Sequence, residues 1–364
     1  MSRRDPKSIL PRTARDIGSG VTNFLSNLGA ILSLLKINQV NKFFFQKKEK
    51  QHTHVLKDIS FDIKAGEKIG IVGESGCGKT TLAKTILRLH DTHAEDSGEI
   101  VFENLNILQF DDKAYRKHRP HLQLIYQDPF LSLNQQMTVQ KILKEPLRLR
   151  HGKMTEQKLS SRIENLMYTY RIQPQNMSKT PQQLSGGECR RVGIARVMAL
   201  EPSFLIADEP VASLDASIKD QIMQLLVSKV KTLMTISHDM RIIKKYVDKI
   251  IVLYSGMIVE IVERNPDAQS ASEAFMFNHP YSKVLLSSVE YFDSKVAKQD
   301  KLKHIQDSDA EIKIPKRGSE ACRCIDLCHQ LGVRSEIELE KCDAVFPKFS
   351  EKTSTKKVAC HYVE

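Results

Sequence analysis

Short apolar runs recur along the chain, and each ends in glycine or polar residues. They occupy residues 69–72, 122–126, 204–207 and 233–236. Short, largely apolar runs of this length are typical of strands that are buried on both faces of a parallel sheet. Residues 154–172, "MTEQKLSSRIENLMYTYRI", instead place apolar residues at helical spacing. The pattern therefore predicts an α/β fold with a lobe of helices between its strands.

The first apolar stretch of the chain has a different period. Residues 21–35, "VTNFLSNLGAILSLL", repeat apolar positions at i, i+3, i+4 and i+7, which predicts an amphipathic helix. Such a helix can lie on a membrane or a partner, and it can equally be a packing appendage. We expect neither a secretory signal nor a transmembrane helix, since the N-terminus is polar and no run of about eighteen apolar residues occurs.

A glycine-rich loop follows the apolar run at 69–72. Residues 73–81, "GESGCGKTT", fit the pattern G-x-x-x-x-G-K-[ST] between a predicted strand and a predicted helix. Glycines let the backbone wrap a nucleotide's phosphates, and the helix start presents free N–H groups to them. Lys79 adds positive charge at the terminal phosphates, and the Thr80 hydroxyl helps to hold Mg²⁺. The predicted nucleotide contacts are Gly73, Glu74, Ser75, Gly76, Cys77, Gly78, Lys79, Thr80 and Thr81.

Three further strand ends carry polar residues. Asp208 and Glu209 end the run at 204–207, His238 follows the run at 233–236, and Gln127 follows the run at 122–126. Ligands of α/β sheets bind at the carboxyl ends of the strands, so these side chains should lie beside the phosphate loop. We expect Asp208 and Gln127 to hold Mg²⁺ together with Thr80, and Glu209 to act as the general base on water. His238 is expected to contact the terminal phosphate and help to hold that water.

A second phosphate-binding turn lies in "QQLSGGECRRVGIAR", residues 182–196. Ser185, Gly186, Gly187 and Glu188 open an amphipathic helix there, and a helix start with glycines can hold an anion closely.

Composition narrows the function less than the motifs do. The chain has 364 residues and a net charge of +11, which suggests a polyanionic partner, although a generally lysine-rich surface fits equally well. No basic patch with interleaved aromatic residues suggests nucleic-acid binding, so we expect no such partner. Of seven cysteines, five lie between residues 322 and 360.

Taken in order, these motifs resemble the ATP-binding subunits of ABC transporters, over residues 35 to 265. The resemblance implies a P-loop NTPase with a RecA-like core, and a helical subdomain over about 128–189. It implies that Asp215 contacts nucleotide and that an aromatic residue stacks on adenine; of Phe43, Phe44 and Phe45 we choose Phe44. It also implies that two ATPases pair head to tail, so that Ser185, Gly186 and Gly187 bind the ATP held by the partner.

Residues 122–150 and the segment 278–289, "NHPYSKVLLSSV", are similar to the oligopeptide/dipeptide importer ATPases. This implies an ATPase on the cytoplasmic face of the inner membrane that drives uptake of peptides, or less commonly nickel. Its partners would be a paralogous ATPase or a second copy, two permease subunits and, indirectly, an extracytoplasmic binding protein. A soluble ABC-type ATPase acting on DNA or ribosomes is the alternative of another class. A weakly hydrolysing, regulatory subunit is a third, because the segment between Leu226 and Ser237 is shorter than in relatives.

The C-terminal region resembles the extension of the same subfamily. We divide the chain into a leader (1–34), the ATPase domain (35–265) and this extension (266–364). The cysteines of the extension follow a pattern that in some relatives is associated with an iron–sulfur cluster. Four thiolates can hold a 4Fe-4S cluster or zinc. The candidate ligands are Cys322, Cys328, Cys342 and Cys360, with Cys324 as an additional candidate.

Overall fold

The computed structural model describes residues 33–46, 51–128, 130, 132–212, 214, 216–268, 273–293, 350–353 and 356–360. The strands are β1 Ser33–Gln46, β2 Gln51–Lys64, β3 Lys68–Val72, β4 Ser97–Phe102, β5 Leu105–Asn106, β6 Leu122–Ile125, β7 Phe204–Asp208, β8 Thr232–Ile236, β9 Lys249–Tyr254, β10 Met257–Glu263, β11 Ser350–Thr353 and β12 Lys356–Val358. The α-helices are α2 Lys79–Ile86, α3 Asp112–Tyr115, α4 Val139–His151, α5 Glu156–Thr169, α6 Gly186–Met198, α7 Ala216–Lys229, α8 Met240–Tyr246 and α9 Pro280–Asp293. Short 3-10 turns are η1 Ile107–Gln109, η2 Arg119–His121, η3 Pro174–Asn176 and η4 Pro181–Gln183.

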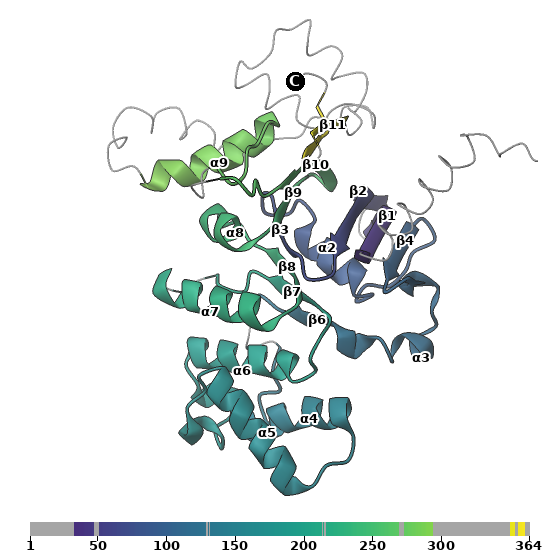
Figure 1. Ribbon diagram of the computed structural model, residues 1–364. Coiled ribbons are helices and arrows are strands. Elements are labelled where there is room, and N and C mark those ends of the chain that lie inside the picture. The colour runs from purple at the N-terminus through teal and green to yellow at the C-terminus, as the bar shows by residue number, and fades with distance from the viewer. Residues whose placement is uncertain are drawn as a thin grey trace, which may run out of the picture.

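The strands form two sheets (Figure 1). The larger sheet has the order β11-β12-β10-β9-β3-β8-β7-β6, and its strands from β9 to β6 are parallel. The smaller sheet, β2-β1-β4-β5, is antiparallel. The apolar runs predicted as buried strands are β3, β6, β7 and β8, and every residue of β7 and β8 is buried. The predicted α/β class is therefore confirmed.

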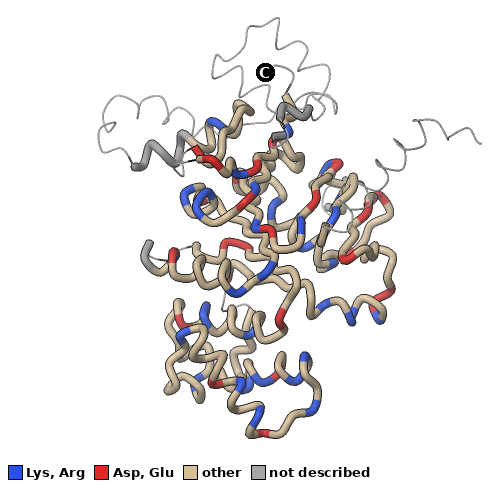
Figure 2. Tube along the Cα trace, viewed as in Figure 1, with Lys and Arg blue, Asp and Glu red and all other residues tan. Residues whose placement is uncertain are grey.

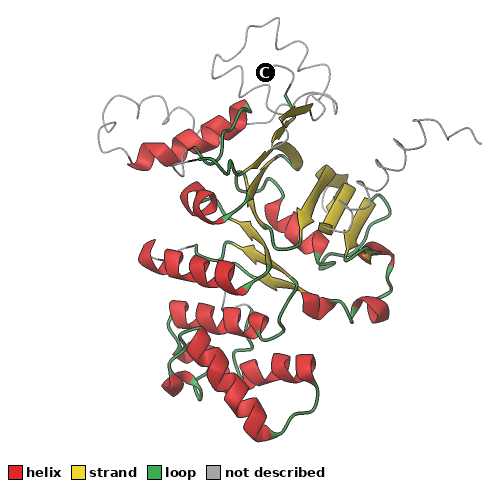
Figure 3. Cartoon of the chain, viewed as in Figure 1, coloured by secondary structure: helices red, strands yellow, loops and turns green. Residues whose placement is uncertain are grey.

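Helices cover both faces of the larger sheet, as the layers in Figure 3 show. Alternate residues of a strand face opposite sides. On β3, Ile69 and Ile71 pack in a core with α2 and the smaller sheet, whereas Val72 packs with α8 and α9 on the other side. A separate core joins α4, α5, α6 and α7 to β7 and fills the lobe at the bottom of Figure 1. The predicted helix at 154–172 lies in that lobe as α5.

The structure bears on two expectations about local structure. The predicted amphipathic helix at 21–35 is wrong at its C-terminal end, because Ser33, Leu34 and Leu35 begin β1; residues 21–32 lie outside the described residues. Leu35 is fully buried and pairs with Ile63 and Phe102, so cross-strand partners decide this position and helical spacing does not. The short segment before His238 is accommodated by a two-residue connection, 230–231, between α7 and β8.

Basic and acidic residues are interleaved along the described chain (Figure 2). Among the described residues, no helix combines the length and the apolar character needed to cross a membrane.

Candidate nucleotide-binding site

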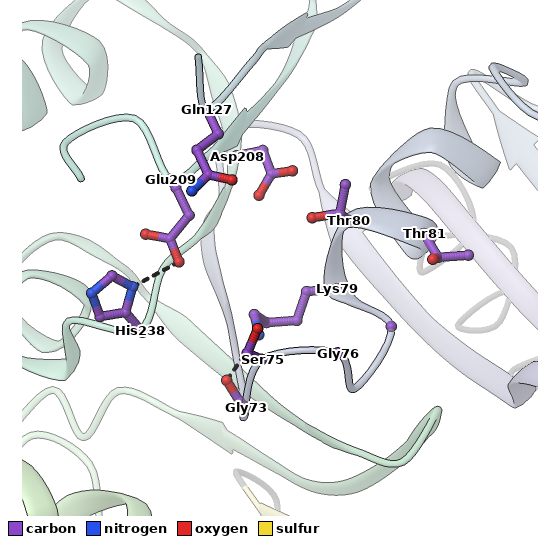
Figure 4. A pocket seen from close by; sticks show the side chains of 11 residues that line it. Gly73, Ser75, Gly76, Lys79, Thr80, Thr81, Gln127, Asp208, Glu209 and His238 are labelled. Carbon is purple, nitrogen blue, oxygen red and sulfur yellow. Dashed lines mark hydrogen bonds and ion pairs between the residues drawn. The ribbon is translucent and has the colours of Figure 1, made fainter. Parts of the chain in front are cut away.

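The polar ends of four strands meet at one edge of the larger sheet. β3 leads into the phosphate loop, and its neighbours in sheet order, β8, β7 and β6, lead into His238, Asp208–Glu209 and Gln127. Together they line a cavity of about 320 Å³ (Figure 4). Its lining residues are Gly73, Ser75, Gly76, Gly78, Lys79, Thr80, Thr81, Gln127, Asp208, Glu209 and His238. The expected meeting of these strand ends thus occurs in the structure.

The phosphate loop depends on its glycines. Gly78 precedes α2 with φ 106°, a left-handed conformation that a side chain would strain. A Cβ on Gly73 would lie 2.2 Å from the carbonyl oxygen of Leu253 on β9. The Lys79 Nζ donates to the carbonyl oxygens of Gly73 at 2.9 Å and Glu74 at 2.6 Å, so the ammonium lies within the curve of the loop. This loop can present backbone N–H groups and one positive charge to a phosphate chain.

Two of the predicted loop contacts do not line this cavity. Glu74 is exposed and lines a neighbouring cavity with Lys219 and Arg241. Cys77 is buried, with its Sγ 3.9 Å from the Lys79 Nζ, and burial raises the pKa of its thiol. Cys77 therefore contributes packing behind the loop, and burial keeps its thiol in the weakly reactive, protonated form.

The residues around Asp208 fit a magnesium ion. Asp208 is buried, and burial raises the pKa of its carboxyl, which a hydrogen bond with Thr80 opposes. Burying a carboxylate is costly unless a cation or donors compensate the charge. Carboxylate, hydroxyl and amide oxygens from Asp208, Thr80 and Gln127 all face the cavity, and hard oxygen ligands are those that Mg²⁺ prefers.

Glu209 is held in a strained and well-defined position. Its φ is 48°, unusual for a residue with a side chain, and its N–H donates to the carbonyl oxygen of Ile236 on β8 at 2.9 Å. Its Oε1 lies 2.8 Å from the Nδ1 of His238, the contact drawn in Figure 4. Backbone outliers of this kind cluster at functional sites. The Glu209 carboxylate points into the cavity, where a general base must lie to reach its substrate, and the His238 imidazole lies beside it.

Arg190, which we did not predict from the sequence, connects three parts of the site. It comes from α6, is 7% exposed, and donates to the carbonyl oxygens of Glu209 at 3.1 Å, Pro210, and Gln127 at 3.1 Å. Burying a guanidinium is costly unless its donors find acceptors, and in Arg190 both Nη atoms do so while the buried Nε makes no hydrogen bond. The helix that begins at the Ser-Gly-Gly turn is therefore attached to the loops after β6 and β7. In the sequence, the only signal at this position is the pair Arg190–Arg191 within the predicted helix.

The Ser-Gly-Gly turn is a well-capped helix start that lies outside this cavity. Ser185 accepts a hydrogen bond from the Glu188 N–H, while Glu188 accepts from the Ser185 N–H at 2.9 Å and from Asn176 at 2.9 Å. These donors lower the pKa of Glu188 to about 2, the bond from the Ser185 N–H having the largest effect. Ser185 and Gly186 are exposed. Glu188 thus stabilises the turn, and the turn faces solvent rather than the phosphate loop of its own chain.

The aromatic candidates for adenine point in different directions. Phe44 packs edge-on against His90 at a centroid distance of 4.9 Å and does not line the cavity. Phe43 stacks on His54 at 4.1 Å. His54 precedes Val55, whose carbonyl oxygen lies close to Gly78 of the phosphate loop. Stacking of Phe44 on adenine thus stays a prediction. Phe43 is a second candidate for this role, because it lies beside the segment that approaches the phosphate loop.

The remaining predicted residues lie mostly outside the described part of the chain, namely Asp215, Cys322, Cys328 and Cys342. Cys360 is described and half-buried, two residues after the end of β12. Within the described ranges no group of three or more His, Cys, Asp or Glu side chains that could hold a metal ion occurs.

Comparison with known proteins places this site in a class. A family model described as ABC transporter matches residues 56–212. A dimeric ATP-binding cassette bound to ADP and Pi is 27% identical, covers 63% of this chain and 98% of its own, and has a TM-score of 0.57. The cbiO1 protein from Clostridium perfringens, part of an ABC transporter complex, is 26% identical, with coverages of 76% and 99% and a TM-score of 0.56.

The chain is also similar to curated proteins over most of its length. The oligopeptide transport ATP-binding protein OppF of Haemophilus influenzae is 32% identical over 89% of this chain and 93% of its own. The oligopeptide transport ATP-binding protein AppF of Bacillus subtilis is 31% identical, with coverages of 90% and 97%. The chain therefore belongs to the ATP-binding proteins of ABC transporters, and it is an ATPase of the P-loop class. Within that class, the relatives above place it with the oligopeptide transport ATP-binding proteins.

Proposed function

We propose that this chain binds and hydrolyses ATP to drive an ABC importer of oligopeptides or dipeptides across the cytoplasmic membrane. The observation that carries this proposal is the assembled cavity: phosphate loop, Asp208, Glu209, Gln127 and His238 meet at one sheet edge. The peptide cargo is supported by the named relatives, which match nearly the full chain.

Within this site each residue has a distinct task. Lys79 and the loop N–H groups bind the β- and γ-phosphates, and Thr80, Asp208 and Gln127 hold Mg²⁺, which when bound neutralises charge on those phosphates. Glu209 accepts a proton from the attacking water, and His238 orients the Glu209 carboxylate through the 2.8 Å contact.

The exposed Ser-Gly-Gly turn supports a head-to-tail pair. An exposed helix start with two glycines is suited to bind the γ-phosphate of an ATP held by another subunit. We propose a paralogous ATPase as that subunit, with a second copy of this chain as the alternative. Two permease subunits and an extracytoplasmic binding protein complete the transporter. The chain then works at the inner face of the cytoplasmic membrane.

The proposed transport function is tested by uptake of a radiolabelled di- or tetrapeptide. A strain that lacks this gene should lose uptake and regain it with the wild-type gene. Lys79→Ala should not restore uptake, because the loop loses its only side-chain cation. Lys158→Ala, a control at an exposed position of α5 outside the cavity, should restore it. Normal peptide uptake in the deletion strain, or lost nickel uptake only, would contradict the peptide assignment.

The cysteine-rich tail is proposed to hold a 4Fe-4S cluster or zinc through Cys322, Cys328, Cys342 and Cys360. Cys360 supports this in one respect: it follows β12, which pairs with β10, so it is fixed to the ATPase sheet. Anaerobically purified protein should contain about four iron atoms or one zinc per chain. Cys342→Ser should reduce that content, and protein that contains neither metal would end the proposal.

A further inference from the structure

A buried tyrosine from the C-terminal extension contacts the phosphate loop from behind. The Tyr281 hydroxyl, near the start of α9, accepts a hydrogen bond from the backbone N–H of Glu74 at 2.9 Å. Tyr281 is fully buried, and its ring packs against that of Tyr254 at a centroid distance of 4.5 Å. The two residues that share this hydrogen bond are 207 positions apart in the sequence.

The start of α9 is fixed to the larger sheet. Glu260 on β10 is fully buried and accepts from the N–H groups of Asn278 at 2.7 Å and His279 at 3.3 Å. The His279 Nδ1 accepts from the Tyr281 N–H at 3.2 Å, which caps the helix start. A carboxylate that accepts backbone N–H bonds in a buried site makes strong, directional contacts. The Tyr281 hydroxyl is therefore held in one place by the sheet.

The last described strand, β12, contacts the residues that hold the start of α9. β12 pairs with β10, with Val358 opposite Glu260, and the Ala359 N–H donates to the carbonyl oxygen of Val259 at 2.9 Å. The His279 ring, which is 1% exposed, also hydrogen-bonds the backbone of Ala359. A continuous series of contacts thus runs from β12 through His279 and Tyr281 to Glu74.

We infer that Tyr281 is a positioning residue for the phosphate loop, and that the C-terminal extension influences ATP binding through it. This inference rests on the nucleotide site proposed above. The peptide group between Gly73 and Glu74 is engaged on both sides, because its N–H donates to the Tyr281 hydroxyl at 2.9 Å and its carbonyl oxygen accepts from the Lys79 Nζ at 2.9 Å. Fixing this peptide fixes the loop curvature before ATP arrives, so less conformational entropy is lost on binding.

The test uses Tyr281→Phe in the full chain, which keeps the ring on Tyr254 and removes the hydroxyl. We expect about three- to tenfold weaker binding of a fluorescent ATP analogue, as for the loss of one buried hydrogen bond. The KM for ATP should rise by a similar factor with kcat nearly unchanged, because the loop binds substrate and transition state alike. Tyr115→Phe is the matched control: its buried hydroxyl donates to the Leu87 carbonyl oxygen at 3.1 Å, outside the cavity.

A second variant tests the connection to the tail. His279→Asn keeps a side-chain acceptor for the Tyr281 N–H, since asparagine also caps helices, but is too short to reach Ala359. We expect about a twofold rise in KM, and no further rise when it is combined with Tyr281→Phe. Unchanged ATP affinity in Tyr281→Phe, or an equal loss in Tyr115→Phe, would overturn the inference. Fully additive effects of His279→Asn and Tyr281→Phe on KM would overturn the inferred link from β12 to the phosphate loop. Lys79→Ala distinguishes a failure of this inference from a failure of the proposed nucleotide site: if Lys79→Ala binds ATP normally, the proposed site itself is wrong.

Discussion

Replacing Glu209 by Gln separates catalysis from folding. The variant changes one carboxylate oxygen into an amide nitrogen and keeps the size of the side chain. It also keeps an oxygen that can accept from His238, and it leaves the backbone bond from the Glu209 N–H to Ile236 intact.

The structure predicts a large effect of Glu209→Gln on the rate of hydrolysis and a small effect on stability. A positioned general base contributes about 10²- to 10⁴-fold to rate, or roughly 3–5 kcal/mol of barrier. The ion pair with His238 contributes far less to stability, because the His238 side chain is 71% exposed and exposed pairs are worth about 0–1 kcal/mol. We therefore expect hydrolysis to fall at least about 100-fold, while the melting temperature shifts by only about 2–4 °C at most.

The assay is steady-state phosphate release by the purified transporter, with ATP binding and thermal melting measured on the same samples. Glu156→Gln is the control, because it makes the same change on α5, where Glu156 pairs with Lys144 and Arg148 away from the cavity. Its hydrolysis rate should match that of wild type. If Glu209→Gln hydrolyses ATP within about threefold of wild type, Glu209 is not the base.

Three further predictions address other parts of the chain. Ser185→Arg should lower hydrolysis at the partner's site at least tenfold and leave this chain's own ATP affinity unchanged in equilibrium binding, because the turn lies outside its own cavity; a loss of its own affinity would contradict the shared site. Burial lowers the pKa of His279 from 6.5 to about 4, so the stability that depends on its neutral form is fully present above about pH 6.5. This contribution, about 3 kcal/mol, is lost as the pH falls toward 4. The free energy of unfolding in urea should therefore depend less on acid pH in His279→Asn than in wild type, and equal pH profiles of the two proteins would refute this role of His279. Phe44→Ala should weaken ATP but not phosphate-only binding if Phe44 stacks on adenine, whereas the same result in Phe43→Ala alone would move that role to Phe43.

Much of the site was predictable because a parallel sheet converts sequence order into spatial order. Once residues 69–72, 122–125, 204–208 and 232–236 are parallel neighbours, the residues after them meet at one edge. The sequence-based choice of Lys79, Thr80 and Asp208 needs only that edge and the chemistry of phosphate and Mg²⁺.

Long-range contacts were not predictable in the same way. Nothing next to Arg190 in the sequence indicates that it binds the carbonyl oxygens of Gln127 and Glu209. The Tyr281 hydroxyl meets Glu74 only because α9 packs behind β3 and β9. The apolar spacing of residues 31–35 predicts a helix at the start of β1, because the partner strands that decide this segment are distant in the sequence.

We propose that each ATP is bound between the phosphate loop of one subunit and the Ser-Gly-Gly turn of another. A structure of the Glu209→Gln transporter with Mg²⁺ and ATP tests this arrangement. We predict that Ser185 and Gly187 of this chain lie within hydrogen-bond distance of the γ-phosphate bound by the phosphate loop of its partner. A closed, ATP-loaded assembly in which Ser185 faces solvent or its own cassette would contradict the shared binding of ATP.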